Sequence, residues 1–156
     1  MQKAAFGAGC FWGVQYEFDK LEGVKITIVG YMGGKTINPS YEQVCSDTTG
    51  HAEAVYIEFD ENLIDYEDLL NVFWKIHDPT QKNKQGPDIG SQYRSVIFYY
   101  NEEQKKQANK SKNDLDNSKT LKRAVKTEIV PATDFYKAEE YHQQYFKKNG
   151  VTGCRI

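Results

Sequence analysis

Short apolar patterns divide the N-terminal part of the chain into predicted strands and one helix. Residues 3–8 form a run of small apolar side chains that is typical of a buried strand, and residues 24–28 alternate apolar and polar positions as a half-buried strand does. Between these segments, apolar side chains recur at helical spacing over residues 13–21. Residues 51–59 alternate again and predict a further strand.

Helix-starting residues mark two further segments. Ser40 followed by Gln43 is the pattern of a capping box, which predicts a short helix after Ser40. Asp65 can begin a second helix. The apolar face of this helix comprises Leu69, Leu70, Phe73 and Ile76.

The C-terminal part continues the alternation of strands and helices. Residues 94–100 and 125–130 predict strands, and residues 102–121 predict a charged surface helix between them. Residues 135–148 predict an amphipathic helix. Its apolar face comprises Phe135, Ala138, His142, Tyr145 and Phe146. Residues 78–92 show no periodicity, and a loop of this length in a compact domain is usually functional.

The order of these segments predicts an α+β fold, an α/β sandwich in which helices pack on a mixed β-sheet. The pattern leaves the order of the strands open. The chain has 156 residues, no internal repeat and no linker-like segment, which predicts a single catalytic domain over 1–156. Gly150 begins a glycine-containing end segment, so we expect 149–156 to be a mobile C-terminal tail.

Composition narrows the class of protein. Hydrophobic residues make up 39% of the chain and charged residues 27%, which is ordinary for a globular protein. A net charge of −2 gives no electrostatic reason for a nucleic-acid or membrane partner. The sequence shows no signal-peptide pattern and no apolar stretch of membrane-spanning length, and three cysteines are too few for a disulfide scaffold. We therefore expect a cytoplasmic protein. We also expect it to act as a monomer, although the sequence leaves the oligomeric state open.

Cys10 is the first candidate for chemistry. It lies in GAGCFWGV, directly after a predicted strand and before a predicted helix. The partial positive charge of a helix N-terminus favours a thiolate there, and the flanking glycines allow close approach. Phe11 and Trp12 supply a hydrophobic wall beside the sulfur. The alternative is that Cys10 is a buried small hydrophobic side chain, as cysteines commonly are.

Glu53 is a carboxyl group in an apolar pattern. In the strand predicted over residues 51–59, it shares a face with Val55, Ile57 and Phe59. Burial on this face would raise its pKa and favour the protonated form. The alternative is that Glu53 lies at an exposed strand end, where burial has no influence.

Several motifs accompany GCFWG in order along the chain. They are GYMGG at 30–34, NPSY at 38–41, VC at 44–45, TGHAEAV at 49–55, FW at 73–74, HDPT at 77–80, D at 88, G at 90, QYRS at 92–95 and AEEYHQ at 138–143. This pattern resembles the A-type peptide methionine sulfoxide reductases over nearly the whole chain. The resemblance implies an enzyme that reduces methionine-S-sulfoxide, free or in proteins, to methionine.

The resemblance also implies roles for individual residues. The sulfoxide oxygen leaves poorly unless it is protonated, so Cys10 would attack the sulfur while Glu53 supplies a proton. Tyr41 and Tyr93 would donate hydrogen bonds to the oxygen, although either alone is typical of an ordinary half-buried tyrosine. Asp88 would orient the substrate backbone, or be a turn residue beside a glycine. Phe11 and Trp12 would hold the S-methyl group.

Recycling of the oxidised cysteine needs a second thiol. A sulfenic acid at Cys10 would condense with another cysteine, and Cys154 on the C-terminal tail is the candidate. The alternative is an incidental surface cysteine. The resemblance implies a Cys10–Cys154 disulfide and thioredoxin as its reductant. Cys45, in the short helix after Ser40, is expected to pack inside as a structural residue.

Two other functions remain open at this point. His51, His77 and His142 lack the spacing of metal ligands, so no metal or other cofactor is expected, and His142 reads as a core histidine. A cysteine hydrolase would use Cys10 with a histidine base. A binding module without enzymatic activity would hold oxidised or methionine-rich segments through the aromatic residues, which are Phe11, Trp12, Tyr41 and Tyr93.

Overall fold

The computed structural model describes residues 1–150. Its elements in chain order are β1 (Gln2–Ala8), α1 (Phe11–Asp19), β2 (Val24–Met32), α2 (Tyr41–Cys45), β3 (Ala52–Phe59), α3 (Tyr66–Lys75), β4 (Lys84–Gln85), β5 (Asp88–Ile89), η1 (Ser91–Tyr93), β6 (Ser95–Tyr99), α4 (Glu102–Ser118), β7 (Glu128–Pro131), β8 (Phe135–Lys137), η2 (Glu140–His142) and α5 (Tyr145–Asn149). The elements η1 and η2 are short 3₁₀ helices.

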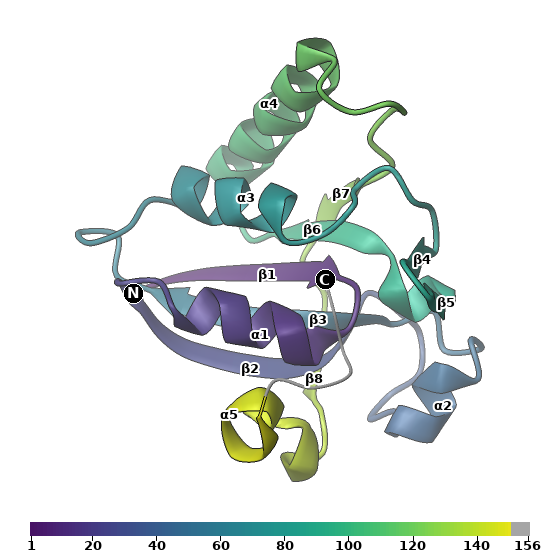
Figure 1. Ribbon diagram of the computed structural model, residues 1–156. Helices are drawn as coiled ribbons and strands as arrows, with labels where there is room; N and C mark the ends of the chain where they lie inside the picture. Colours follow the sequence, from purple (N-terminus) through teal and green to yellow (C-terminus); the bar gives the residue numbers. More distant parts are fainter. Residues whose placement is uncertain (151–156) are drawn as a thin grey trace.

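A mixed sheet with the strand order β7-β6-β1-β3-β2-β8 forms the centre of the fold (Figure 1). All neighbouring strands are antiparallel except β6 and β7, which are parallel. Because β3 runs antiparallel to both β1 and β2, these two strands are parallel, and α1 connects them across β3. The predicted α+β fold with helices packed on a mixed sheet is confirmed.

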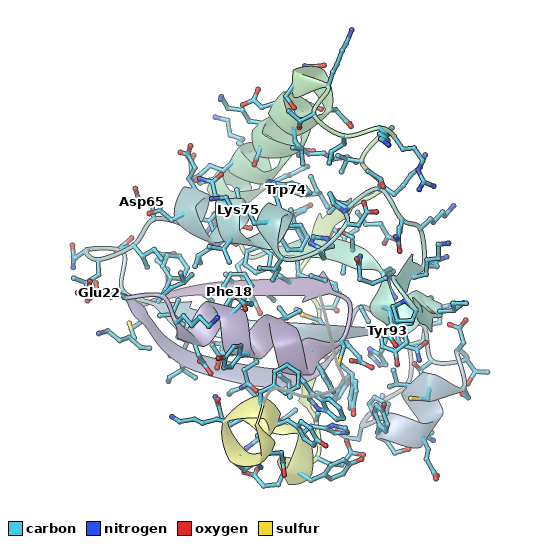
Figure 2. The ribbon with its side chains drawn as sticks, viewed as in Figure 1. Phe18, Glu22, Asp65, Trp74, Lys75 and Tyr93 are labelled. Atoms are coloured by element: carbon cyan, nitrogen blue, oxygen red, sulfur yellow. The ribbon has the colours of Figure 1, made fainter. Side chains whose placement is uncertain are left out.

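The two faces of the sheet are covered differently. The larger core cluster joins β1, β2 and β3 to α1 and α3 through side chains such as Phe6, Phe18 and Phe73. Phe18 points from α1 toward the sheet (Figure 2). The smaller cluster on the opposite face includes Met32 and Phe98, and Phe135 packs against it. The alternation along β3 therefore sets which of its side chains lie under the helices.

Local sequence signals place the helix starts. The side chain of Ser40 accepts a hydrogen bond from the Gln43 N–H, and the Gln43 side chain accepts one from the Ser40 N–H, so the predicted capping box is confirmed. Asp65 and Asp68 form the corresponding pair at the start of α3. Between β1 and α1 the chain turns at Gly9, whose φ of +92° is strained for any residue with a side chain.

The prediction of one helix over residues 135–148 is wrong. Phe135–Lys137 forms strand β8 along the edge of β2, and Gln144 adopts a left-handed conformation with φ +54° before the short helix α5. The side-chain amide of Gln143 accepts a hydrogen bond from the Val29 N–H and donates one to the Val29 carbonyl, as a strand neighbour would. Tertiary pairing with the sheet edge thus overrides the helical spacing of the apolar side chains.

Smaller corrections concern element boundaries. The strand predicted over 125–130 begins only at Glu128, and the helix predicted over 102–121 ends at Ser118, where Lys119 turns left-handed. The segment 78–92 contains the small hairpin of β4 and β5 and the 3₁₀ helix η1. Within residues 1–150, no helix has both the length and the apolar character needed to cross a membrane.

Candidate active site

Cys10 lies between the end of β1 and the first turn of α1. It is the N-cap residue of α1, and its side chain is half-buried. Tight packing surrounds this turn, because a Cβ on Gly7 would lie 2.7 Å from the Val96 Cγ1 and 3.2 Å from the Glu53 carbonyl oxygen. Glycine at this position therefore lets the end of β1 approach β3, which brings the helix start close to Glu53.

Glu53 is a buried carboxyl group at the beginning of β3. Its side chain is 2% exposed, and Oε1 accepts a hydrogen bond from the Phe11 N–H at 3.2 Å. Burial raises the pKa of Glu53 well above its usual value, and a negative charge on Cys10 raises it further; the Phe11 N–H opposes this shift only in part. The predicted buried face is confirmed, and the alternative of an exposed strand end is wrong.

Three other predicted site residues come from separate elements and meet near this carboxyl group. Tyr41 begins α2, Asp88 begins β5 and Tyr93 ends η1, and Tyr93 lies on the side of the molecule that carries β4, β5 and α2 (Figure 2). Burial raises the pKa of both tyrosines, and a charge on Glu53 would raise them further. Asp88 interacts electrostatically with Glu53 and Tyr93. The tyrosines are therefore neutral hydrogen-bond donors.

Aromatic side chains surround the start of α1. We define the aromatic cluster as Phe11, Trp12, Tyr31, Tyr41 and His142. The Phe11 ring centroid lies 5.8 Å from that of Tyr31 and 5.2 Å from that of His142. The His142 ring lies 4.5 Å from Tyr41, measured between centroids, and 5.7 Å from Trp12. Phe11 is buried and Trp12 and Tyr41 are half-buried, so the cluster forms an apolar surface beside Cys10.

Glu139 is a residue of this region that the sequence interpretation did not assign. Its carboxylate accepts a hydrogen bond from the Tyr31 hydroxyl at 2.8 Å and another from the Tyr41 N–H at 2.9 Å. Burial acts to raise the pKa of Glu139, but these hydrogen bonds outweigh it, so the pKa is lowered. Glu139 thereby joins β2 to the start of α2. The motif AEEYHQ was the available signal, but it carries no indication of contact partners.

The remaining candidate residues are two cysteines and two histidines. Cys45 was expected to pack inside, which is wrong: the residue is exposed on the short helix α2, where only Val44 is buried. Burial raises the pKa of its thiol, and hydrogen bonds with Tyr41 and Gln92 lower it in part. Cys154 lies outside the described residues. The two ring nitrogens of His51 form hydrogen bonds with backbone groups, and those of His77 form hydrogen bonds with a backbone carbonyl and a serine hydroxyl. None of these partners is a cysteine.

The mixed sheet, the cysteine at the start of α1 and the buried carboxyl group beside it define an α+β thiol enzyme. Within residues 1–150, no cluster of three or more His, Cys, Asp or Glu side chains could hold a metal ion.

Comparison with known proteins gives the family. The family model for peptide methionine sulfoxide reductase matches residues 2–156. A peptide methionine sulfoxide reductase MsrA from Methanosarcina acetivorans is 58% identical over 96% of this chain and 80% of its own length. The chain belongs to the peptide methionine sulfoxide reductase family, and it is an enzyme that reduces methionine sulfoxide in peptides.

Solved structures agree with this assignment. Mxr1 from Saccharomyces cerevisiae in its reduced form superimposes with a TM-score of 0.92 at 33% identity, covering 99% of this chain and 88% of that one. Mxr1 has also been solved in complex with Trx2; that structure has a TM-score of 0.67 at 23% identity over 99% of this chain and 86% of that one, and shows the fold.

Proposed function

We propose that Cys10 reduces methionine-S-sulfoxide by attacking the sulfoxide sulfur. The oxygen is transferred to the Cys10 sulfur, which becomes a sulfenic acid, and methionine is released. Two electrons pass from the cysteine sulfur to the substrate. The observation that carries this proposal is the buried Glu53 carboxyl group beside the start of α1, bonded to the Phe11 N–H.

Glu53 acts as the proton donor. A neutral carboxylic acid can protonate the sulfoxide oxygen, which otherwise leaves as a poorly stabilised anion. A helix N-terminus favours negative charge, and Cys10 is its N-cap residue, so the thiolate and the neutral acid occupy suitable neighbouring positions. A negative charge on Cys10 raises the pKa of Glu53. This coupling supports a state in which the two groups together carry one proton.

The remaining site residues bind the substrate. The hydroxyl groups of Tyr41 and Tyr93, which are neutral, donate hydrogen bonds to the sulfoxide oxygen where negative charge develops. Phe11 and Trp12 contact the S-methyl group, a small apolar target suited to aromatic faces. Asp88, at the start of β5, orients the backbone of the substrate. The preference for the S epimer is what the resemblance to the A-type reductases implies.

Recycling uses the C-terminal segment and an external reductant. Cys154 attacks the sulfenic acid at Cys10, forming a disulfide and releasing water. Thioredoxin then reduces this disulfide, which the complex of yeast Mxr1 with Trx2 supports. The Cys154→Ser variant is expected to complete about one turnover with thioredoxin but to cycle with a small thiol. Repeated turnover of this variant with thioredoxin would exclude the Cys154 role.

Location and assembly belong to the same proposal. We place the enzyme in the cytoplasm as a monomer, where reduced thioredoxin is present and disulfides are transient.

Product analysis on separated sulfoxide epimers tests the proposal. The wild-type protein with dithiothreitol is expected to convert the S epimer to methionine and to leave the R epimer unchanged. The Cys10→Ser variant should convert neither, whereas Cys45→Ser serves as the matched cysteine control and should retain activity. Conversion of the R epimer, or activity in Cys10→Ser, would contradict the proposal.

The two alternative functions make different predictions. A cysteine hydrolase needs a histidine base, but the ring nitrogens of His51 and His77 are engaged elsewhere, and His142 bonds to Trp12. A binding module would bind the sulfoxide without producing methionine. Retained turnover in single alanine variants of the three histidines excludes the first alternative, and any catalytic turnover excludes the second.

A further inference from the structure

The indole ring of Trp12 is held by residues from the far end of the described chain. Its Nε1–H donates a hydrogen bond to the Nδ1 of His142 at 2.9 Å. One face of the indole stacks on Tyr145, with ring centroids 3.7 Å apart and planes inclined by 6°. The hydrogen bond fixes the edge of the ring and the stacking fixes its plane, so both determinants of its orientation come from η2 and α5.

The hydrogen bond requires one protonation state of His142. An indole N–H can only donate, so Nδ1 must accept, and the proton of the neutral ring lies on Nε2. His142 is 1% exposed, and its Nε2 has no hydrogen-bond partner among residues 1–150. A protonated ring would carry a second N–H facing the indole N–H, which would break the bond. The hydrogen bond to Trp12 therefore requires His142 to be neutral.

We propose that His142 is a positioning residue that sets the orientation of Trp12 and thereby the affinity of the site for the S-methyl group of the substrate. The proposal rests on the function proposed above, in which Trp12 contacts that methyl group. His142 itself does not react and acts only through the indole ring. Its loss is expected to raise KM for methionine sulfoxide and to change kcat less.

The charges around His142 determine how its hydrogen bond with Trp12 responds to pH. Glu139 on the same segment is the neighbouring carboxylate, and Glu140 pairs with Lys137 at 3.4 Å on the exposed side. Tyr41 from α2 and Tyr141 face the ring as neutral hydroxyl-bearing side chains, while Phe11 and Trp12 from α1 bring no charge. Burial lowers the pKa of His142 and Glu139 opposes this shift, with a net lowering. The bond to Trp12 is therefore intact at neutral pH and is lost on acidification.

The chain contains its own control for this hydrogen bond. Trp74 on α3 is the second tryptophan, and its Nε1–H donates to the Ser111 hydroxyl on α4 at 2.7 Å. Figure 2 shows Trp74 on α3, next to α4. Because a serine hydroxyl does not titrate in the accessible pH range, the indole N–H of Trp74 should not respond when a histidine is protonated.

A nuclear magnetic resonance titration and a kinetic cycle test the proposal together. In ¹⁵N-labelled wild-type protein, the Trp12 indole N–H resonance is expected to shift with a midpoint below pH 6.5, while that of Trp74 stays constant. His142→Phe should abolish the shift and raise KM about three- to tenfold, the range expected for one hydrogen bond. His142→Asn restores an acceptor near the Nδ1 position and should recover most of the affinity.

A double-mutant cycle separates positioning from a structural effect. Trp12→Phe removes the indole N–H, so its effect on KM and that of His142→Phe should not add in the double variant. Additive effects, a pH-independent Trp12 resonance, or an unchanged KM in His142→Phe would each overturn the proposal. If His142→Phe does not fold, the wild-type titration and His142→Asn still decide it. Failure of the wild-type protein to reduce the sulfoxide would overturn the proposed function instead, while the resonance still reports on the pairing.

Discussion

Two carboxyl groups beside the aromatic cluster have opposite protonation behaviour. Glu53, at the start of β3, is 2% exposed and accepts a hydrogen bond from the Phe11 N–H. Glu139, before η2, is half-buried and accepts hydrogen bonds from the Tyr31 hydroxyl and the Tyr41 N–H. The pKa of Glu53 is raised by burial, whereas that of Glu139 is lowered because its donors outweigh burial.

The comparison shows how one carboxyl group can transfer a proton while another holds neighbouring side chains in place. Burial without enough donors keeps a carboxyl group neutral and able to release a proton, whereas several donors stabilise the charged form. Glu53 is thus suited to proton transfer, and Glu139 to holding Tyr31 and Tyr41 in place. Changes on the Glu53 side should alter the chemical step, and changes on the Glu139 side should alter stability and geometry.

Removal of the nucleophile should have the largest effect. The Cys10→Ser variant is expected to show no detectable turnover, because a serine hydroxyl is not ionised at neutral pH and is a far weaker nucleophile than a thiolate. Steady-state assays with the S epimer and dithiothreitol measure this. Residual turnover above that of the uncatalysed reaction would show that the sulfur of Cys10 is not the reacting atom.

The Glu53→Gln variant tests the proton donor. Glutamine keeps the shape and can still accept from the Phe11 N–H, but it has no acidic proton, so kcat should fall about 10²- to 10⁴-fold. The matched variant Glu139→Gln should lower kcat by no more than about tenfold, since it loses only part of a hydrogen-bonding network. Equal losses in both variants would remove the distinction between the two carboxyl groups.

The pH dependence of the wild-type rate should reflect the raised pKa of Glu53. As pH rises through this pKa, the acid loses its proton and the rate should fall by about tenfold per pH unit. The fall should be absent from the low residual rate of Glu53→Gln. A descending limb of the same midpoint in both proteins would assign it to another group.

Stability should change in opposite directions for the two substitutions. Because the folded pKa of Glu53 lies above its unfolded value, its contribution is full below about pH 4.5 and is lost as pH rises through the folded pKa. Glu53→Gln should therefore gain stability relative to wild type as pH rises. The folded pKa of Glu139 is depressed, so its contribution is present above pH 4.5 and is lost on acidification.

Denaturant unfolding at several pH values measures both effects. At neutral pH, Glu139→Gln should lower the free energy of unfolding by about 1 kcal/mol, since the residue is half-buried and partly screened by solvent. A stabilised Glu139→Gln variant, or a Glu53→Gln variant whose relative stability falls with pH, would reverse the signs and contradict the account.

The smallest effect is expected for Cys45. Its side chain is exposed, and a serine hydroxyl can replace the thiol in hydrogen bonds with Tyr41 and Gln92. Cys45→Ser should keep kcat within about twofold and the free energy of unfolding within about 0.5 kcal/mol of wild type. A larger loss of kcat would show that this thiol takes part in the reaction.

Short-range patterns predicted the part of the site that depends on local geometry. The alternation along residues 51–59 placed Glu53 on the buried face, and the Ser40–Gln43 pair located α2, because both features depend on spacing within one element. The turn before Cys10 uses Gly9, whose φ of +92° favours glycine.

Long-range pairing could not be predicted from the same patterns. The contact between Trp12 and His142 joins positions 130 residues apart, and the helical spacing of residues 135–148 concealed a strand on the edge of β2. Cys45 was misplaced because α2 has only five residues and buries only Val44, so its spacing does not specify an inner face. The strand order also depends on pairings that a single sequence does not show.

The protonation state of Glu53 is the central claim, and a direct titration of its carboxyl carbon tests it. In protein labelled with ¹³C at glutamate Cδ, the Glu53 resonance is assigned by its absence from Glu53→Gln and followed with pH. We predict a midpoint well above the usual value of 4.5, with Glu139 titrating below it. A midpoint for Glu53 at or below 4.5 would contradict the account.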